Sequence, residues 1–346
     1  MQFPADIPGL QPPQECFQTA VSAPVQQHMV MGNLPPYNGP IDVVPLIDSQ
    51  TAQLLGSLPG VTIRQKGSWG EALTGGICEV RNRYTLHAGA SREALDNPPI
   101  MSAKENSSDC MRCCCAPNHN VFVEFRLSED PDDTTAPIAM TFEREGLFGK
   151  CPCCCTCAEC CLDSMAMHAG QIMAGPDSAG KLADRSRVFG TAKQALQRCS
   201  CTPTIEVFDG PEAAKGNVPH SVIHGPFIFG GCLEACIDTS FPVSRPPGRK
   251  IGDMAQIQKL KPRNFGELCT ECFQDADRYY VEFRDPSLTP QQKANLIGAL
   301  LLTDFMFFEL DNGMCSCRNK KLTITLFLCY CCGCLCPCQI VFQSDS

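Results

Sequence analysis

The sequence predicts a mainly β protein in which many short antiparallel strands surround one hydrophobic helix near the carboxyl terminus. Apolar and polar residues alternate in VFVEFRL (121–127) and IAMTFE (138–143), a period of two that is typical of strands with one buried face. Turn-rich segments such as SEDPDDTT (128–135) separate these runs, which favours antiparallel connections. One long apolar segment after residue 289 breaks the pattern and can fill the space that curled strands enclose.

The predicted strands lie between a proline-rich arm and a cysteine-rich tail. Residues 1–50 contain many prolines and little apolar periodicity, so we expect a disordered arm, through which any protein partner would bind. Residues 51–310 form the predicted barrel domain. Residues 311–346 form a hydrophobic tail.

The long apolar segment has the signals of a helix over about residues 290–309. Thr289 suits the N-cap and Pro290 the first helical position. The apolar run 294–308 would measure about 22 Å, short of the roughly 30 Å hydrocarbon core of a bilayer. Burial within protein is therefore favoured, and a membrane span stays the alternative. The predicted core residues of the helix are Leu300, Asp304, Phe305, Phe307 and Phe308.

Composition restricts the possible functions. The chain has 346 residues and 44% of them are hydrophobic, which is enough for a sizeable core. A formal net charge of -9 repels phosphates, so general nucleic-acid binding is not expected. The start, MQFPADIPGLQPPQ, lacks the apolar stretch of a secretory signal, so we expect maturation in the cytosol. Thiols stay reduced there, and disulfides are a poor explanation for 27 cysteines.

The densest cysteine cluster, CPCCCTCAECC (151–161), suits lipid attachment better than metal binding. Adjacent thiols cannot all converge on one tetrahedral zinc ion, whereas each can accept an acyl chain, and two chains anchor a protein stably. The predicted acylation sites are Cys151, Cys153, Cys154, Cys155 and Cys157. Zinc stays a less favoured alternative, with candidate ligands in the pairs Cys110/Cys113, Cys157/Cys160 and Cys269/Cys272 and in His119 and His168.

Several stretches together resemble the phospholipid scramblase family. DADRYYVEF and LIGALLLTDFMFFE are similar to its carboxyl-terminal signature, and EALTGGICEVRNRY, CMRCCCAP, TFEREGLFGKCPCCCTCAECC and VIHGPFIFGGC follow the family order upstream. The resemblance implies a tubby-like closed antiparallel β-barrel wrapped around the helix. It also implies calcium-dependent, ATP-independent phospholipid movement between leaflets and thioacylation (palmitoylation) in the cysteine-rich run. The expected location is the cytoplasmic face of the plasma membrane.

The resemblance places a calcium segment at Asp275, Asp277 and Asp285. Calcium prefers several oxygen ligands on a flexible loop, often with a glycine at the sixth position and an acid at the twelfth. Tyr280 and Pro286 occupy those positions here, so we expect weak calcium binding at most. The alternative is a solvated acidic turn before the strand YYVEF.

The tail differs from the family, whose chains commonly end soon after the helix. Residues 322–342 form a 21-residue uncharged stretch, about 31 Å long if helical, so it could span a bilayer. Gly333 and Pro337 weaken a helix, and the six cysteines of the stretch offer a second acylation site as the alternative.

The favoured function is a membrane-attached, scramblase-like protein whose partner is the phospholipid membrane. One alternative is a lipid-anchored interaction or signalling module that moves no lipid, and another is a zinc-binding structural protein. No GxSxG elbow appears, so we expect no enzyme.

Overall fold

The computed structural model describes most of the chain after residue 45. The described residues are 46–66, 81–106, 120–145, 156, 158–172, 187–197, 200–211, 218–246, 251–264, 266–268, 277–308, 314–318 and 321–343. The predicted arm therefore lies outside them except for residues 46–50.

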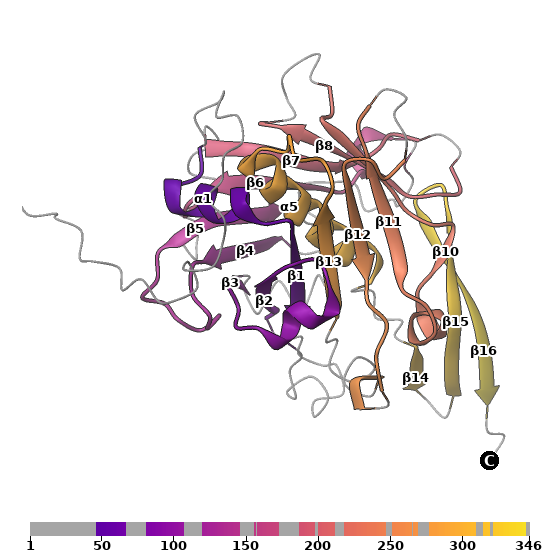
Figure 1. Cartoon of the computed structure of the whole chain (residues 1–346). Helices are drawn as coiled ribbons and strands as arrows, with labels where there is room; N and C mark the ends of the chain where they lie inside the picture. Colours follow the sequence, from indigo (N-terminus) through magenta and orange to yellow (C-terminus); the bar gives the residue numbers. More distant parts are fainter. Residues whose placement is uncertain are drawn as a thin grey trace, which may run out of the picture. The chain divides into compact units, whose positions relative to one another are not determined.

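Twelve antiparallel strands close into a barrel in the order β1-β13-β12-β11-β9-β8-β7-β6-β5-β4-β3-β2 (Figure 1). They are β1 (Gly60–Gln65), β2 (Arg83–Ala88), β3 (Met101–Glu105), β4 (Val121–Arg126), β5 (Ile138–Arg144), β6 (Ser164–Ala169), β7 (Val188–Gln194), β8 (Thr204–Asp209), β9 (Ser221–His224), β11 (Thr239–Ser244), β12 (Ala255–Lys259) and β13 (Arg278–Phe283). The first and last strands close the barrel, with Val61 opposite Val281. The predicted fold class is confirmed.

The helix α5 (Pro290–Phe307) packs against β6, β7, β8 and β13. Thr289 and Gln292 form a reciprocal capping box at its start, and Pro290 follows the cap. Such a cap satisfies backbone donors that the first turn leaves unpaired. The predicted core residues Leu300, Asp304, Phe305 and Phe307 are buried, and Phe308 is the half-buried C-cap. The helix is therefore the core of the barrel, as the sequence predicts.

A close approach between α5 and β7 depends on Gly190. A Cβ atom at Gly190 would lie 1.8 Å from Oδ1 of Asn295 and would displace that side chain. The absence of a side chain at Gly190 therefore leaves room for Asn295 of α5 against β7.

A short helix, α1 (Ser49–Ser57), contacts the amino-terminal part of α5. Lys293 of α5 donates from Nζ to the carbonyl oxygens of Gly56 at 2.9 Å and Leu58 at 2.7 Å. Burial lowers the pKa of Lys293 to about 8. These carbonyls lie at the end of α1, so the ammonium group joins the two helices.

The tail forms strands, and the helical form considered for residues 322–342 is not what the structure contains. β15 (Lys321–Cys331) and β16 (Cys334–Gln343) form a hairpin, and β14 (Cys315–Arg318) and β10 (Ile228–Phe229) pair with β15. Cys332 and Gly333 form the turn with φ of 51° and 90°, the positive values of a type I′ hairpin turn. Pro337 lies in the edge strand, where a missing backbone donor is tolerated.

Within the ranges that the structure describes, no helix combines the length and the apolar content needed to cross a bilayer.

The core position of α5 predicts that Leu300→Ala destabilises the whole barrel domain. Leu300 is buried and Leu196 is 52% exposed. We expect the free energy of unfolding to fall by about 2 to 5 kcal/mol in Leu300→Ala, because the substitution leaves a cavity, and by less than about 0.5 kcal/mol in Leu196→Ala. Urea titrations followed by circular dichroism measure both changes. Equal changes in the two variants would contradict the core position.

Candidate functional site

A cluster of buried ionisable side chains lies where α5 ends inside the barrel. Lys259 of β12 forms ion pairs with Asp277 Oδ2 at 2.7 Å and with Glu234 Oε2 at 2.8 Å. The Tyr279 hydroxyl of β13 lies 2.8 Å from Asp277 Oδ2 and also contacts Oδ1 of Asp304 in α5. The side chains of Lys259 and Asp277 are only 5% and 3% exposed. We call these five residues the buried acidic cluster.

The hydrogen bonds of the cluster require a proton on one of the two carboxyl groups that contact Tyr279. A tyrosine hydroxyl has one hydrogen, so Tyr279 can donate to only one of its two carboxyl partners. Both contacts are satisfied when Asp304 is protonated and donates to the Tyr279 oxygen, while Tyr279 donates to Asp277. Burial, followed by the negative charge of Asp277, raises the pKa of Asp304 from 3.8 to about 7.

The charge balance of the cluster agrees with this assignment. Lys259 is its single cation and faces three carboxyl groups, so full ionisation would leave excess negative charge inside the barrel. Burial also raises the pKa of Glu234, and Lys259 opposes that shift. The Lys259 ammonium lies 4.0 Å from the centre of the Phe308 ring, a cation–π contact at the end of the helix. The cluster can therefore hold and release a proton near neutral pH.

The sequence indicated two members of this cluster but not the cluster itself. Asp277 was predicted as a calcium ligand and Asp304 as a core helix residue, whereas Glu234, Lys259 and Tyr279 were not singled out. Tyr279 and Lys259 are directly opposite in the β12–β13 register. That pairing is not visible in the sequence, because about twenty residues separate the two positions.

The two described calcium candidates lie at opposite ends of β13. Asp277 precedes the strand and bonds Lys259, and Asp285 follows it and pairs with Arg245 at 2.5 Å. Eight residues of strand span about 26 Å, which exceeds the size of one calcium coordination shell. The described pair does not fit a shared calcium ion. Asp275 lies outside the described residues, and calcium binding stays a prediction.

The predicted acylation sites Cys151, Cys153, Cys154, Cys155 and Cys157 lie outside the described residues. Thr156, within that run, is described and buried. Its backbone nitrogen donates to the carbonyl oxygen of Cys332 at 3.2 Å, and its hydroxyl donates to the carbonyl oxygen of Gln197 at 3.0 Å. Thr156 is therefore bonded to the turn of the β15–β16 hairpin.

Among the candidate zinc ligands, His168 is the one whose surroundings the structure describes. His168 is fully buried beside Glu143, with 3.4 Å between Nε2 and Oε2. Among described residues there is no group of three or more His, Cys, Asp or Glu side chains that could hold a metal ion. Several candidate zinc ligands, Cys110, Cys113, His119, Cys157, Cys269 and Cys272, lie outside the described residues.

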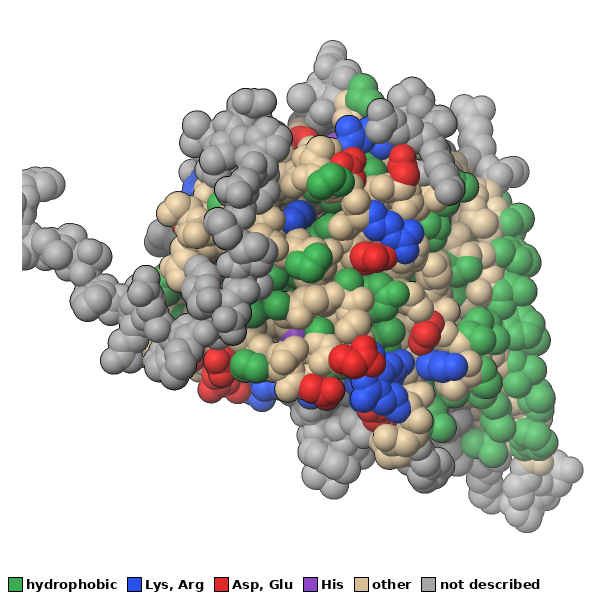
Figure 2. Space-filling view, viewed as in Figure 1, with side chains coloured by type: hydrophobic (Ala, Val, Ile, Leu, Met, Phe, Trp, Pro, Cys, Tyr) green, Lys and Arg blue, Asp and Glu red, His purple; other side chains and the backbone are tan. Residues whose placement is uncertain are grey.

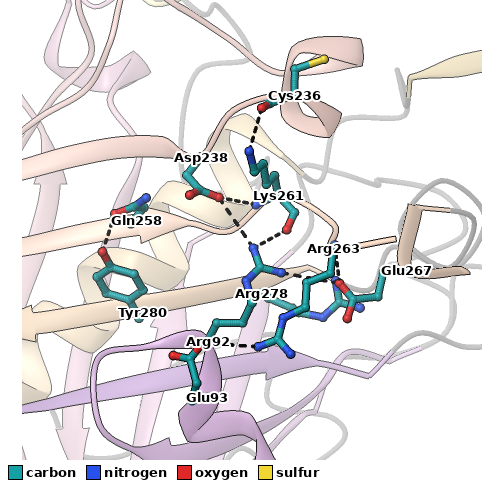
Figure 3. A network of polar contacts seen from close by, with 10 residues as sticks. All are labelled: Arg92, Glu93, Cys236, Asp238, Gln258, Lys261, Arg263, Glu267, Arg278 and Tyr280. Atoms are coloured by element: carbon teal, nitrogen blue, oxygen red, sulfur yellow. Dashed lines mark hydrogen bonds and ion pairs between the residues drawn. The ribbon is translucent and has the colours of Figure 1, made fainter. Parts of the chain in front are cut away.

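A second polar network lies beside β12 and β13 at the surface (Figure 3). Arg92 of the 3-10 helix η2 (Arg92–Asp96) pairs with Asp238 at 3.7 Å and Glu267 at 3.5 Å. Arg278 also pairs with Glu267 at 3.5 Å, and the backbone nitrogen of Lys261 donates to Asp238 Oδ1 at 2.7 Å. These cations are engaged by carboxylates of the same chain, so the network joins η2 to the end of β12.

One hydroxyl–imidazole pair was missed in the sequence. His224 of β9 and Ser244 of β11 lie 2.9 Å apart between Nε2 and Oγ. Burial lowers the pKa of His224, which favours the neutral ring. Activation of a serine nucleophile also needs a group that orients the imidazole, and no such bond to His224 is recorded among the described residues. We therefore assign no catalytic role to His224 and Ser244.

The family model described as Scramblase matches residues 40–310. That range contains α1, the barrel and α5, whereas the β15–β16 hairpin lies beyond it. The chain is similar to Phospholipid scramblase 2 of Bos taurus, with 26% identity over 84% of this chain and 79% of the relative. It is also similar to Phospholipid scramblase 1 of Homo sapiens, with 24% identity over 74% of this chain and 65% of the relative. No solved structure matches the chain.

The raised pKa of Asp304 predicts a pH-dependent effect of Asp304→Asn. Between the unfolded pKa of 3.8 and the folded pKa of about 7, the folded state binds more protons than the unfolded state. The stability that Asp304 contributes is therefore fully present at low pH and is lost as pH rises through 7. From pH 5 to pH 8 we expect the wild-type chain to lose on the order of 2 to 4 kcal/mol relative to Asp304→Asn. Urea titrations at each pH measure this difference.

Asp285→Asn is the matched control for that experiment. Although burial opposes the shift, hydrogen bonds from Ser287 and the charge of Arg245 lower the pKa of Asp285. Its contribution is present above 3.8 and is lost only as pH falls, so its difference from wild type should stay constant from pH 5 to pH 8. A constant difference for Asp304→Asn as well would rule out Asp304 as the proton-binding group.

Proposed function

Because this chain belongs to the Scramblase family, we propose that it moves phospholipids between the two leaflets of a membrane. The observation that carries the proposal is the family match over residues 40–310, which includes the complete barrel and its core helix. The matched relatives are named phospholipid scramblases. The function assigned to them is thus proposed for the part of this chain that they share.

The proposal includes the finer features that the family resemblance implies. We propose that lipid movement needs no ATP, responds to calcium and takes place at the cytoplasmic face of the plasma membrane. The described carboxylates do not form a shared calcium site, so calcium dependence is the feature that most needs measurement. No covalent chemistry on a substrate is proposed.

Attachment to the membrane is proposed to occur through thioesters in the run 151–157. Consecutive thiols suit several acyl chains, and several chains give the stable attachment that a single chain lacks. The bond between Thr156, a described residue of this run, and Cys332 in the turn of the apolar hairpin supports one common membrane-facing side.

A second candidate function is a lipid-anchored interaction module that moves no lipid. The observation that favours it is the position of α5, whose buried side chains fill the barrel interior that a lipid headgroup would otherwise occupy. Lipid movement would then need a path outside the barrel or an opening of it. An assay of lipid movement separates the two candidates.

Reconstitution into liposomes tests the proposed function directly. We expect the full chain to raise the rate at which fluorescent phospholipids in the inner leaflet become accessible to an external quencher. The rate should be the same with and without ATP and should rise when calcium replaces a chelator. Protein that binds the liposomes without raising this rate would establish the interaction module instead.

Two leucine-to-aspartate variants test whether lipid movement requires the folded barrel. Leu300→Asp places an unpaired charge in the core, whereas Leu196→Asp places one at an exposed position. Lipid movement should be lost in the first variant and kept in the second. Movement that survives Leu300→Asp would show that the folded barrel is not responsible.

Thioester attachment predicts sensitivity to hydroxylamine, which cleaves thioesters. Treatment should shift most of the protein from the membrane pellet to the supernatant and leave only weak, reversible binding. Serine at Cys151, Cys153, Cys154, Cys155 and Cys157 together should give the same shift without treatment. Stable membrane attachment after both changes would contradict these positions as the anchor.

A further inference from the structure

The β15–β16 hairpin presents a continuous apolar face on its exposed side. Residues directly opposite in an antiparallel pair share a face, and faces alternate along each strand. Leu328 and Tyr330 are buried, so their neighbours Phe327, Cys329 and Cys331 point the other way. With the β-bulge between Thr325 and Phe327 taken into account, the register defines the outer hairpin face as Leu322, Ile324, Phe327, Cys329, Cys331, Cys334, Cys336, Cys338, Ile340 and Phe342.

This face contains no polar or charged side chain. Leu322, Ile340 and Phe342 are 40%, 43% and 54% exposed. Figure 2 shows the resulting apolar band over the edge of the molecule that β15 and β16 form in Figure 1. A soluble sheet normally directs its polar residues outward, so this hairpin has the reverse pattern.

The apolar surface extends beyond the hairpin to β10. Ile228 pairs with Cys329 and is 39% exposed, whereas the next pair, Phe229 and Leu328, is buried. Ile228 therefore lies on the same side as the outer hairpin face. The surface thus crosses three strands and cannot be explained by a single exposed residue.

The hairpin's surroundings indicate what covers this surface. The backbone nitrogen of Thr156, the described residue inside the predicted acylation run, donates to the carbonyl oxygen of Cys332 in the hairpin turn at 3.2 Å. At the other end, Arg318 is opposite Lys321, the single charged residue of the two hairpin strands. The acyl chains proposed for this run and the exposed Lys321 at the other end of the hairpin match features that hold peripheral proteins on membranes.

We propose that the outer hairpin face lies in the interface of a phospholipid bilayer and acts as a second membrane contact, separate from the acylated run. The choice of a bilayer as the occupant rests on the proposed function. The hairpin lies outside the family-matched residues 40–310, so the family match does not by itself imply this contact. Lys321 lies at the end of the hairpin on the side of Thr323, and its long exposed side chain would reach anionic headgroups at the rim of the contact.

A second copy of the chain is a less suitable occupant. Copies could pair along the free edge of β16, but Pro337 in that strand lacks a backbone donor and interrupts such pairing. Pairing at an edge would also leave the outer face uncovered, because hydrogen bonds lie in the plane of the sheet and the side chains of the face point out of that plane.

Vesicle titration of the deacylated chain tests the proposal. The full chain is treated with hydroxylamine, kept reduced and titrated with phosphatidylcholine vesicles that contain a minority of phosphatidylserine, and bound protein is measured by flotation. We expect measurable, reversible binding that weakens at least about tenfold in Phe342→Asp, since burial of one large apolar side chain contributes that much. Absence of binding by the deacylated wild-type chain would overturn the proposal.

Val341→Asp is the matched control. Val341 is adjacent to Phe342 and equally exposed, 54% for each, but it pairs with Thr323 on the opposite face. The proposal requires that Val341→Asp binds vesicles like wild type and that both variants keep the wild-type melting temperature. Equal binding by the two variants, whether both are weakened or both unchanged, would overturn the face assignment.

Two further readouts separate this proposal from its alternatives. Light scattering reports the oligomeric state, and a dimer that Phe342→Asp dissociates without a change in vesicle binding would assign the face to a second copy. Lipid movement is not measured in this experiment. If the chain moves no lipid, the result of the binding experiment does not change. If the hairpin does not bind vesicles, the liposome assay still decides whether the chain moves lipid.

Discussion

The structure depends on one constraint, the filling of a closed twelve-stranded barrel by a single helix. A barrel of this size encloses more space than the inward side chains of its own strands can fill. The helix α5 supplies the missing volume, and it can do so because leucine, isoleucine, alanine and phenylalanine lie on all of its sides. Gly190 leaves room for the Asn295 side chain of the helix, and Lys293 fixes the start of the helix to α1. Removing the helix would leave the strands without a common core.

The buried acidic cluster adds a polar requirement to this apolar core. Apolar contacts are not directional, so they fix the position of a helix less strictly than hydrogen bonds do. The hydrogen bonds among Asp304, Tyr279 and Asp277 are satisfied in one position of α5 only. The cluster also links that position to protonation. A change of charge on Asp304 alters the hydrogen bond that joins α5 to β13.

The sequence was sufficient to predict the architecture but not the polar site. The alternation in VFVEFRL and the capping signals at Thr289 and Pro290 are local patterns. Local patterns can be recognised in the sequence without knowing which residues are in contact. Glu234, Lys259 and Asp304 meet only after three distant segments fold, so no spacing reveals them. The tail shows a third case. The length of the tail and its lack of charge suit a membrane helix, but the turn at Cys332 and Gly333 and the proline at 337 favour a hairpin.

The order of elements along the chain has a consequence for biosynthesis. β1 pairs with β13, and the helix that fills the barrel follows β13, so the core is completed only by the last fifth of the sequence. At roughly 5 to 20 residues per second, the ribosome needs on the order of ten seconds or more to pass from β1 to the end of α5. During that time every apolar strand face lacks its partner. The apolar strand faces therefore stay without the core helix until α5 has been synthesised, and a product that ends before residue 290 lacks the helix that fills the barrel.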